Sequence, residues 1–243
     1  MPRGLRLCSL HLALILALGC IPALIPPPEL LFAEPEIPVP PSAVSGMDDV
    51  SPFDWFYTYV RIGYRHGFLH GRDGNFEPDR ALTRAEFIIT LGRFHRALGG
   101  YVDYNETTIG TDTGAYMPYL LWASGLHILV GDDPGRFRPN DPILRAEMAA
   151  MLMNYLNVYS LYDHFLPQYE DYEEDFADFS DIPSWARSAA QSLRNFGVIQ
   201  GIRRSADPPD VYRFEPFAQT RRSEAAAIFG RMFLTIFDGM VAV

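Results

Sequence analysis

Lysine is missing from this chain: all 20 basic residues are arginine, against 30 acidic residues, and the net charge is −10 at pH 7. The absence excludes chemistry that needs a lysine, such as Schiff-base catalysis or a P-loop phosphate site. A negative chain without a basic tract also argues against nucleic-acid binding, which phosphate neutralisation dominates.

Catalytic and metal-binding motifs are missing as well. The sequence contains neither G-x-S-x-G nor H-E-x-x-H. His66 and His70 have the spacing of two metal ligands on one helix face, but Gly67 lies between them and no third ligand is evident. The acidic glycine loops at 71–79 and 131–141 lack calcium-ligand spacing and favour turns. We therefore expect no enzyme activity, no cofactor and no metal site.

Cysteine occurs only at Cys8 and Cys20, inside an apolar segment near the N-terminus. This segment has the pattern of a secretory signal peptide, residues 1–33, with cleavage after Ala33 and a Pro-rich linker at 34–47. Acylation of Cys20 and an uncleaved anchor remain alternatives. A chain processed after Ala33 would hold no thiol and no disulfide.

An internal repeat is the strongest pattern in the chain. The segment "FEPDRALTRAE" at 76–86 recurs as "FRPNDPILRAE" at 137–147 and as "FEPFAQTRRSE" at 214–224. Each copy has Phe-x-Pro, then Arg eight and Glu ten residues after the Phe. The recurring arginines, called the motif arginines below, are Arg84, Arg145 and Arg222.

A second helical pattern precedes each of these segments. Trp55 stands 16 residues before Gly71, and Trp185 stands 16 before Gly201, whereas the second copy has Ala115 in place of the tryptophan. The pattern predicts a helix that begins at 51–52 in the first copy. The unit is thus helix, glycine-containing loop, Phe-x-Pro and second helix. Such a unit cannot bury both apolar stripes alone, but three units packed together can.

The second helix of the first copy begins with a predicted capping box, formed by Thr83 and Glu86. Arg84 follows in the first turn, where a cation is mildly unfavourable. In the other copies Leu144 and Arg221 replace the threonine while the arginine persists, which favours a role for the guanidinium itself. A salt bridge to a neighbouring repeat, or common descent of the copies, would explain the recurrence equally.

Another substitution affects the end of the first helix. His127 takes the place of the glycine that ends this helix in the other copies, so the turn needs a left-handed histidine or a different path.

These residues resemble the S-layer homology (SLH) family. "FSDIPSWARSAAQSLRNFGVIQG" (179–201) and "GNFEPDRALTRAEFIITLGRF" (74–94) are similar to the two halves of an SLH repeat. The resemblance implies an all-α fold in which three helix-loop-helix repeats pack as a pseudo-threefold helical spindle. We assign repeat 1 to 48–104, repeat 2 to 108–165 and repeat 3 to 175–238.

The resemblance also implies a function. Proteins of this family are held to the bacterial cell surface by binding an anionic, often pyruvylated, cell-wall polysaccharide, with the motif arginine in a groove between repeats. We expect free N–H groups at the helix start and the arginine beside them to bind a ketal carboxylate. The expected glycan-binding residues are Arg84, Arg145, Arg222, Trp55, Trp185, Gly71 and Gly201.

Two alternatives stay open. The tryptophans can stack on sugar rings, although an aromatic residue at helical spacing is more often part of the core. The chain as a whole can instead be an assembly protein that binds another envelope protein.

Among the repeats, we expect the first to keep an intact site and the second, which lacks the tryptophan, to have lost binding.

Overall fold

The computed structural model describes residues 47–102, 115–130, 137–161, 163–165 and 176–241. In these parts the chain forms helices joined by loops, with isolated β-bridges and no strand. The all-α class is therefore confirmed. The predicted signal peptide 1–33, Cys20 and all but the last residue of the predicted linker lie outside the described residues.

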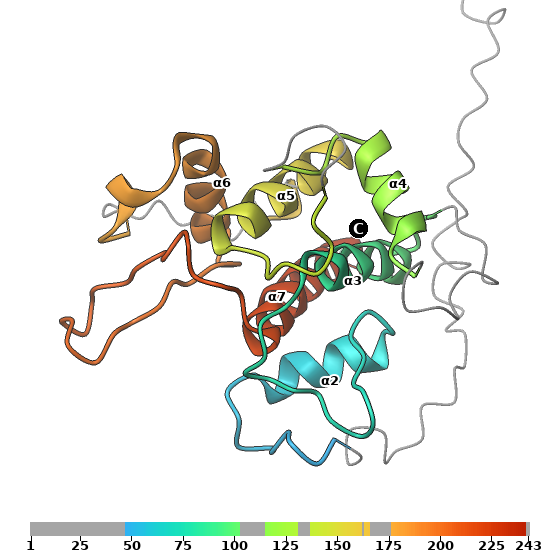
Figure 1. The fold of residues 1–243 in the computed structure, drawn as a ribbon, viewed down its shortest axis with the longest axis horizontal. Helices are drawn as coiled ribbons and strands as arrows, with labels where there is room; N and C mark the ends of the chain where they lie inside the picture. The colour runs from blue at the N-terminus through green and yellow to red at the C-terminus, as the bar shows by residue number, and fades with distance from the viewer. Residues whose placement is uncertain (1–46, 103–114, 131–136, 162, 166–175, 242–243) are drawn as a thin grey trace, which may run out of the picture. The chain divides into compact units, whose positions relative to one another are not determined.

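The described helices come in three pairs, and each pair spans one copy of the repeat (Figure 1). The bounds are α2 Tyr57–Arg65 and α3 Arg84–Ala97, α4 Met117–Gly125 and α5 Arg145–Val158, and α6 Ser184–Asn195 and α7 Arg222–Val241, with a 3₁₀ turn at Phe179–Asp181. The helix that sequence analysis placed at 51–52 begins only at Tyr57. Ser51 and Asp54 instead form a turn, in which the Asp54 carboxylate accepts the Ser51 N–H at 2.7 Å.

The second helices begin as their first turns predict. The Thr83 hydroxyl accepts the Glu86 N–H at 3.2 Å, and the Glu86 carboxylate accepts the Thr83 N–H at 2.9 Å, which confirms the capping box. The glutamate half persists in the other copies, where Glu147 and Glu224 accept the N–H of the residue three positions earlier, both at 3.0 Å. Replacing the threonine therefore removes one hydrogen bond and keeps the other.

Left-handed residues recur at two places in each repeat. The residue that ends the first helix has a positive φ in every copy, at Gly67 (74°), His127 (56°) and Gly197 (70°). The left-handed histidine is thus confirmed. The middle residue of Phe-x-Pro is left-handed too, at Glu77, Arg138 and Glu215. This conformation is strained for residues other than glycine, so surrounding contacts must stabilise it.

An aspartate carboxylate provides that support in repeats 1 and 3. The two oxygens of Asp49 accept the N–H groups of Phe76 and Glu77, at 2.7 and 2.6 Å. Asp178 does the same for Phe214 and Glu215, both at 2.7 Å. Each aspartate thus holds the Phe-x-Pro turn against the start of its repeat.

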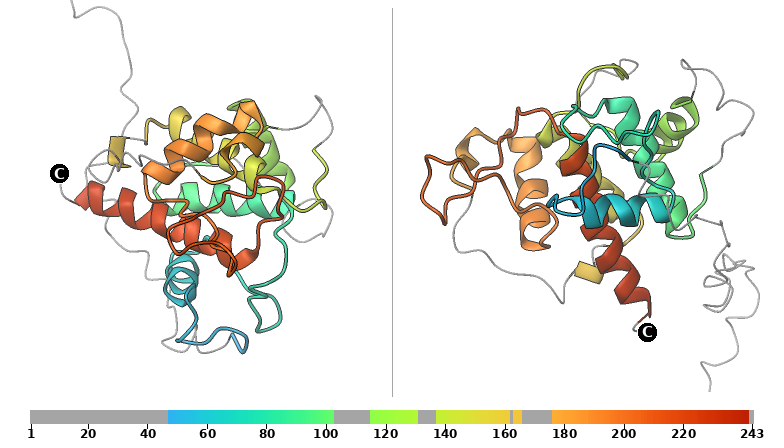
Figure 2. Two further views of the ribbon diagram at one scale, coloured as in Figure 1. Left: turned by 90° about the vertical axis from the view of Figure 1, so that its left-hand side faces the viewer. Right: turned by 90° about the horizontal axis from the view of Figure 1, so that it is seen from below.

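Helices pack across repeat boundaries. The main helix contacts join α4 to α3, α6 to α5, and α2 to α7 (Figures 1 and 2). The first helix of each repeat thus lies on the second helix of the preceding repeat. The order is circular, because repeat 1 packs on repeat 3 in the same way. Close approach depends on glycine at two of these contacts. A Cβ on Gly92 would overlap the ring of Tyr119, and one on Gly230 would overlap the ring of Tyr59.

Backbone hydrogen bonds join the three loops in the same circular order. The N–H of Leu82 donates to the carbonyl of Thr220, Thr220 donates to Ile143, and Ile143 donates to Leu82, at 2.8, 3.0 and 2.9 Å. These equivalent residues lie two positions before the motif arginines. The pseudo-threefold spindle remains a prediction, which this circular order favours.

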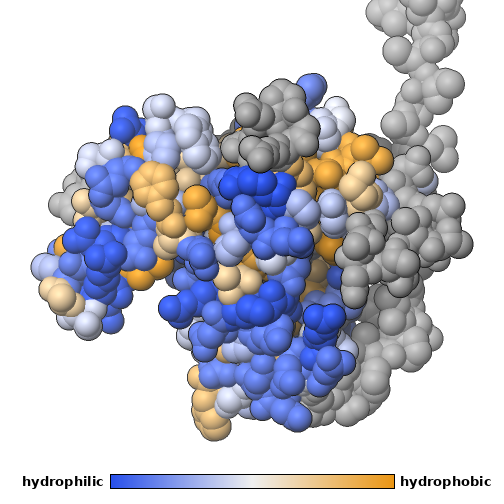
Figure 3. Space-filling model, in the orientation of Figure 1, coloured by the Kyte–Doolittle hydropathy of each residue, from blue (hydrophilic) through white to orange (hydrophobic). Residues whose placement is uncertain are grey.

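One apolar core runs through the three pairs, with Phe68, Phe94 and Phe229 in mutual ring contact at its centre. On the face shown in Figure 3, hydrophilic side chains dominate over α2, and apolar patches are exposed nearer α4 to α6. None of the described helices combines the length and apolar character needed to cross a membrane.

Candidate functional site

The motif arginines connect each repeat to the next. Each donates a hydrogen bond from Nε to the carbonyl of the Phe in the next repeat's Phe-x-Pro, and each guanidinium lies over that ring. The pairs are Arg84 with Phe137, Arg145 with Phe214 and Arg222 with Phe76, at Nε–O distances of 2.9, 2.6 and 2.7 Å. Their recurrence therefore has a structural cause.

The first N–H groups of the second helices are also used within the protein. The N–H of Arg84 donates to the carbonyl of Asp141, and the N–H of Ala85 donates to that of Pro139, at 2.9 and 3.0 Å. Equivalent bonds start α5 and α7. The expectation of free donors for an anion at these helix starts is therefore wrong at the first two positions of each helix.

The motif arginines differ in how tightly the protein holds them. Arg84 is 1% exposed, and its Nη1 lies 2.8 Å from Oε1 of Glu147. For Arg145 the corresponding ion pair, to Glu224, is 3.5 Å long. For Arg222 the distance to Glu86 is 3.9 Å. Burial lowers the pKa of Arg145 and that of Arg222, and the facing glutamates act in the opposite direction.

Arg145 differs from the other two motif arginines in the hydrogen bonding of its Nη2 donor. In Arg84 it donates to the carbonyl of Val130 at 3.3 Å, and in Arg222 to the carbonyl of His70 at 2.7 Å. Val130, His70 and Gln200 are equivalent in the repeats. Among the described residues, nothing accepts a hydrogen bond from Nη2 of Arg145, although the residue is only 4% exposed.

A cleft of about 280 Å³ lies at this arginine, with contributions from all three repeats. Repeat 1 contributes Trp55, repeat 2 contributes Arg145, and repeat 3 contributes the 199–202 loop and one face of α7. The lining residues are Trp55, Arg145, Ile199, Gln200, Gly201, Ile202, Glu224, Ala227, Ile228 and Arg231. Three of the seven predicted site residues thus meet in one place.

The other predicted residues lie elsewhere. Arg222 contacts the loop that ends at Gly71, through the His70 carbonyl, and Arg84 is buried at the junction of repeats 1 and 2. Trp185 is 52% exposed at the start of α6, and Trp55 is 60% exposed. The interpretation of the tryptophans as core residues is therefore wrong, and both present surface that a ligand can contact.

Gly201 has a physical reason to be glycine. Its φ is +82°, and a Cβ there would come within 2.9 Å of the Phe176 ring and 3.1 Å of the Arg213 carbonyl. The loop beside it is closed by two hydrogen bonds between Ile202 and Arg213, at 2.8 and 2.9 Å. The inserted loop 203–212 therefore projects from the cleft-forming turn without opening it.

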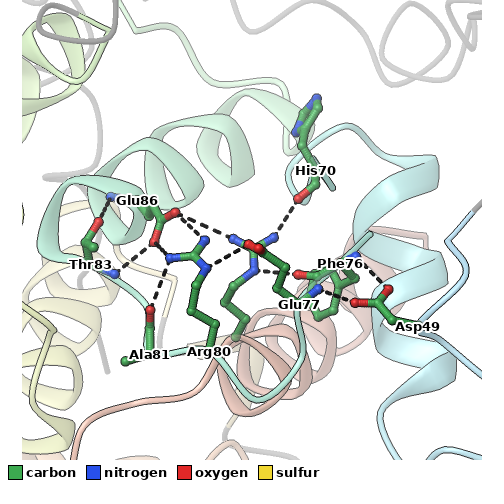
Figure 4. A network of polar contacts seen from close by, with 9 residues as sticks. Asp49, His70, Phe76, Glu77, Arg80, Ala81, Thr83 and Glu86 are labelled. Carbon is green, nitrogen blue, oxygen red and sulfur yellow. Dashed lines mark hydrogen bonds and ion pairs between the residues drawn. The ribbon is translucent and has the colours of Figure 1, made fainter. Parts of the chain in front are cut away.

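Arg80 and Glu86 belong to a network of polar contacts at the surface (Figure 4), and Nη1 of Arg222 lies 3.9 Å from the same Glu86 carboxylate. Arg80 donates to Glu77 at 2.7 Å and to both carboxylate oxygens of Glu86, at 2.6 and 3.1 Å. Although burial acts to raise it, the pKa of Glu86 is held below its usual value by the hydrogen bonds from Arg80 and Thr83. Glu86 is therefore an anion already surrounded by donors.

A second cleft, of about 320 Å³, lies beside the inserted loop. It is lined by Asp178, Asp181, Arg204, Arg213, Glu215, Pro216, Phe217 and Ala218. Arg204 pairs with Glu215 at 2.7 Å and Arg213 pairs with Asp207 at 2.9 Å, so both cations are neutralised within the protein. In the described parts of the chain, no three His, Cys, Asp or Glu residues are grouped as metal ligands.

Sequence reasoning missed three polar residues of the 280 Å³ cleft: Gln200, Glu224 and Arg231. Arg231 lies over the Tyr59 ring and donates to the Val198 carbonyl at 3.0 Å and to the Gln200 side chain at 3.1 Å. A signal was present, because Arg231 stands nine residues after its motif arginine, as Arg93 does in repeat 1.

Two segments of the chain match a known family. Residues 46–88 and 109–149 match the model described as the S-layer homology domain. Both segments lie in the first two repeats, with the first starting just before repeat 1. Repeat 3 is supported by its equivalent sequence motif and its equivalent hydrogen bonds.

Comparison with curated proteins gives relatives of much greater length. The chain is 29% identical over 170 residues to an amylopullulanase of Thermoanaerobacterium thermosulfurigenes and 27% identical over 178 residues to cell surface glycoprotein 1 of Acetivibrio thermocellus. It is 24% identical over 185 residues to an endoglucanase of a Bacillus species. These alignments cover 69, 70 and 76% of this chain but only 8, 7 and 18% of the relatives.

Proposed function

We propose that this chain, in which two segments match the S-layer homology domain, binds an anionic, pyruvylated wall polysaccharide in the 280 Å³ cleft and has no catalytic role. Its place would be the outer surface of a bacterial cell. What it would hold there, another domain or another protein, is a separate question from how it attaches.

The observation that carries the proposal is the chemistry of the cleft. The cleft is lined by an exposed indole, by isoleucine and alanine residues, and by a buried arginine that has an unused donor. A sugar ring presents a flat apolar face that stacks on an aromatic ring, and a guanidinium matches a carboxylate in shape and charge. These three surfaces suit a sugar that carries a carboxylate substituent.

The net charge of −10 opposes attraction between this chain and an acidic polymer at long range. Binding therefore has to depend on short-range contacts in the cleft, where a charge-assisted hydrogen bond is stronger than at an exposed surface. We expect affinity to fall only modestly with added salt, because few polymer charges are neutralised by each bound chain.

Sedimentation with purified, protein-free cell walls tests the proposal. The chain should pellet with untreated walls, remain in solution with walls from which the attached polymer has been removed, and be displaced by the isolated polymer. Equal pelleting before and after removal of the polymer would contradict the proposal. Failure to pellet with either preparation, together with capture by an envelope-protein fraction, would favour the assembly function instead.

A further inference from the structure

The three junctions between repeats contain equivalent residues, so the protein itself supplies the comparison that shows which junction can bind an anion. At the junction of repeats 2 and 3, Nη2 of Arg145 is unused and its ion pair with Glu224 is 3.5 Å long. The arginine is held in place by its bond to the Phe214 carbonyl. It is thus a fixed, buried donor that faces a cleft.

Arg231 supplies a second guanidinium to the same cleft. Its two hydrogen bonds to the 198–200 turn and its position on the Tyr59 ring fix its orientation. Each bond uses one of the two N–H groups on its nitrogen, which leaves donors for a ligand. Of the described residues, three charged ones line the cleft: Arg145, Arg231 and Glu224. Their formal charge sums to +1, which a single carboxylate neutralises.

The junction of repeats 1 and 2 lacks both features. The Nη2 of Arg84 is used by the Val130 carbonyl, and its Nη1 lies 2.8 Å from Glu147. The residue equivalent to Arg231 is Asn154, whose amide donates to the Ile128 carbonyl at 3.2 Å. At this junction the single cation is held by an ion pair and two hydrogen bonds, whereas two cations line the cleft.

The junction of repeats 3 and 1 has two arginines as well, but both contact groups of the protein itself. The Nη2 of Arg222 donates to the His70 carbonyl at 2.7 Å, and Arg93 lies 3.1 Å from Nδ1 of His70. The position of the stacking tryptophan is taken by Ala115. A sugar at this junction would lack both the aromatic wall and the buried donor.

We propose, building on the glycan-binding function above, that the cleft between repeats 2 and 3 is the single strong anion site of this chain and that Arg231, oriented by Gln200, is its second cation. The ligand is a sugar bearing one carboxylate, bound in a 1:1 complex between the two guanidinium groups. The site is composite, because its aromatic wall, its buried donor and its second cation come from three different repeats.

Isothermal titration of the full chain with a methyl glycoside that carries a pyruvate ketal tests this inference. We expect one site per chain, and at least tenfold weaker binding of the same glycoside without the ketal. Gln200→Glu should weaken binding at least tenfold, because the new carboxylate would pair with Arg231 and repel the ligand. Since Gln200 is exposed, this variant should keep the parent's melting temperature.

The chain offers a matched control. His70→Glu places the same charge at the equivalent position, beside Arg93 in place of Arg231, and should leave the affinity and the one-site stoichiometry unchanged. Arg231→Ala and Arg93→Ala form a second matched pair, of which only the first should weaken binding.

Three outcomes would overturn the inference: two or three equal sites per chain, an effect of His70→Glu as large as that of Gln200→Glu, or unchanged affinity in Gln200→Glu. In each case pelleting with untreated walls but not with stripped walls would show that the proposed function still holds. If the parent chain neither binds the ketal glycoside nor pellets with walls, the proposed function and this inference fail together.

Discussion

Arg84 and Arg145 occupy equivalent positions in consecutive repeats and have different surroundings. Arg84 is enclosed: its guanidinium lies 2.8 Å from a carboxylate that is itself only 7% exposed. Arg145 has a longer ion pair to Glu224, which is 21% exposed, and it faces a cleft. The difference shows that one repeated residue can be enclosed at one junction and face a cleft at another.

The largest effect we expect is that of Arg84→Met on stability. Among the described residues, the substitution leaves the buried Glu147 with one ion-pair partner, Arg138 at 3.3 Å, and it removes the bond to the Phe137 carbonyl. Breaking a buried pair in this way costs about 3–5 kcal/mol. Urea denaturation measures the loss, and binding by the folded fraction should be unchanged. A loss below about 1 kcal/mol would contradict the enclosed role of Arg84.

Arg145→Met should have a smaller effect on stability and a larger effect on binding than Arg84→Met. We expect a loss of about 1–3 kcal/mol in the free energy of unfolding, because the Phe214 carbonyl loses its donor while the longer ion pair contributes less. Wall binding should fall at least tenfold. Parallel denaturation and sedimentation of the two variants test the comparison, and it fails if both variants lose binding equally.

Substitutions of the two tryptophans should differ in their effect on binding and leave stability unchanged. Trp55→Ala should weaken wall binding by about 1–2 kcal/mol, a value typical of a lost stacking contact. Trp185→Ala, a change of nearly equal exposure outside the cleft, should leave binding intact. Both variants should keep the parent's stability within about 0.5 kcal/mol. Equal binding loss in the two variants would mean that the cleft is not the single site.

Acid should weaken the junction of repeats 1 and 2 through His95. Burial lowers the pKa of this histidine to about 4, from an ordinary value of 6.5, and its Nδ1 lies 3.2 Å from the Tyr155 hydroxyl. Since the unfolded state binds the proton more readily, stability is full above pH 6.5 and falls as the pH drops toward 4.

Denaturation midpoints measured from pH 7.5 to 4 test this dependence. His95→Gln should flatten the curve in part, and not completely, because burial and the neighbouring Arg93 and Arg222 also lower the pKa of His70 to about 4. A curve identical to that of the parent would show that His95 does not contribute.

The smallest effect concerns a helix cap. Leu144→Thr restores at α5 the hydroxyl that Thr83 provides at α3, and should stabilise the chain by about 1 kcal/mol. Thr83→Ala should cost about the same. Thermal melts of both variants, with the double variant to test additivity, would show whether the caps act independently at the two junctions.

Much of the architecture could be predicted because it depends on near neighbours in the chain. Thr83 and Glu86 are three residues apart, and His127 replaces a glycine at a helix end, so their roles follow from local geometry. The start of α2 could not be predicted in this way. The Ser51–Pro52 signal was overridden by a turn that the Asp54 carboxylate closes.

The site was predicted only in part, because its residues come from three different repeats. Periodicity identified the motif arginines, both tryptophans and both glycines, but sequence analysis expected the best site in repeat 1. The structure brings together Trp55, Arg145 and Gly201, one from each repeat, with Arg231 beside them. No spacing along the chain indicates which copy's residue meets which, because the circular packing of repeats sets those pairings.

By itself, the sequence determined the repeat, its helices and caps, the absence of lysine chemistry and the resemblance to the S-layer homology family. These depend on residue type and on neighbours a few positions away. The tertiary structure alone decided which arginine keeps an unused donor. That outcome depends on whether a loop carbonyl from the next repeat reaches Nη2, as it does for Arg84 and Arg222 but not for Arg145. Such a contact joins residues that are far apart in the chain, and only the folded protein places them.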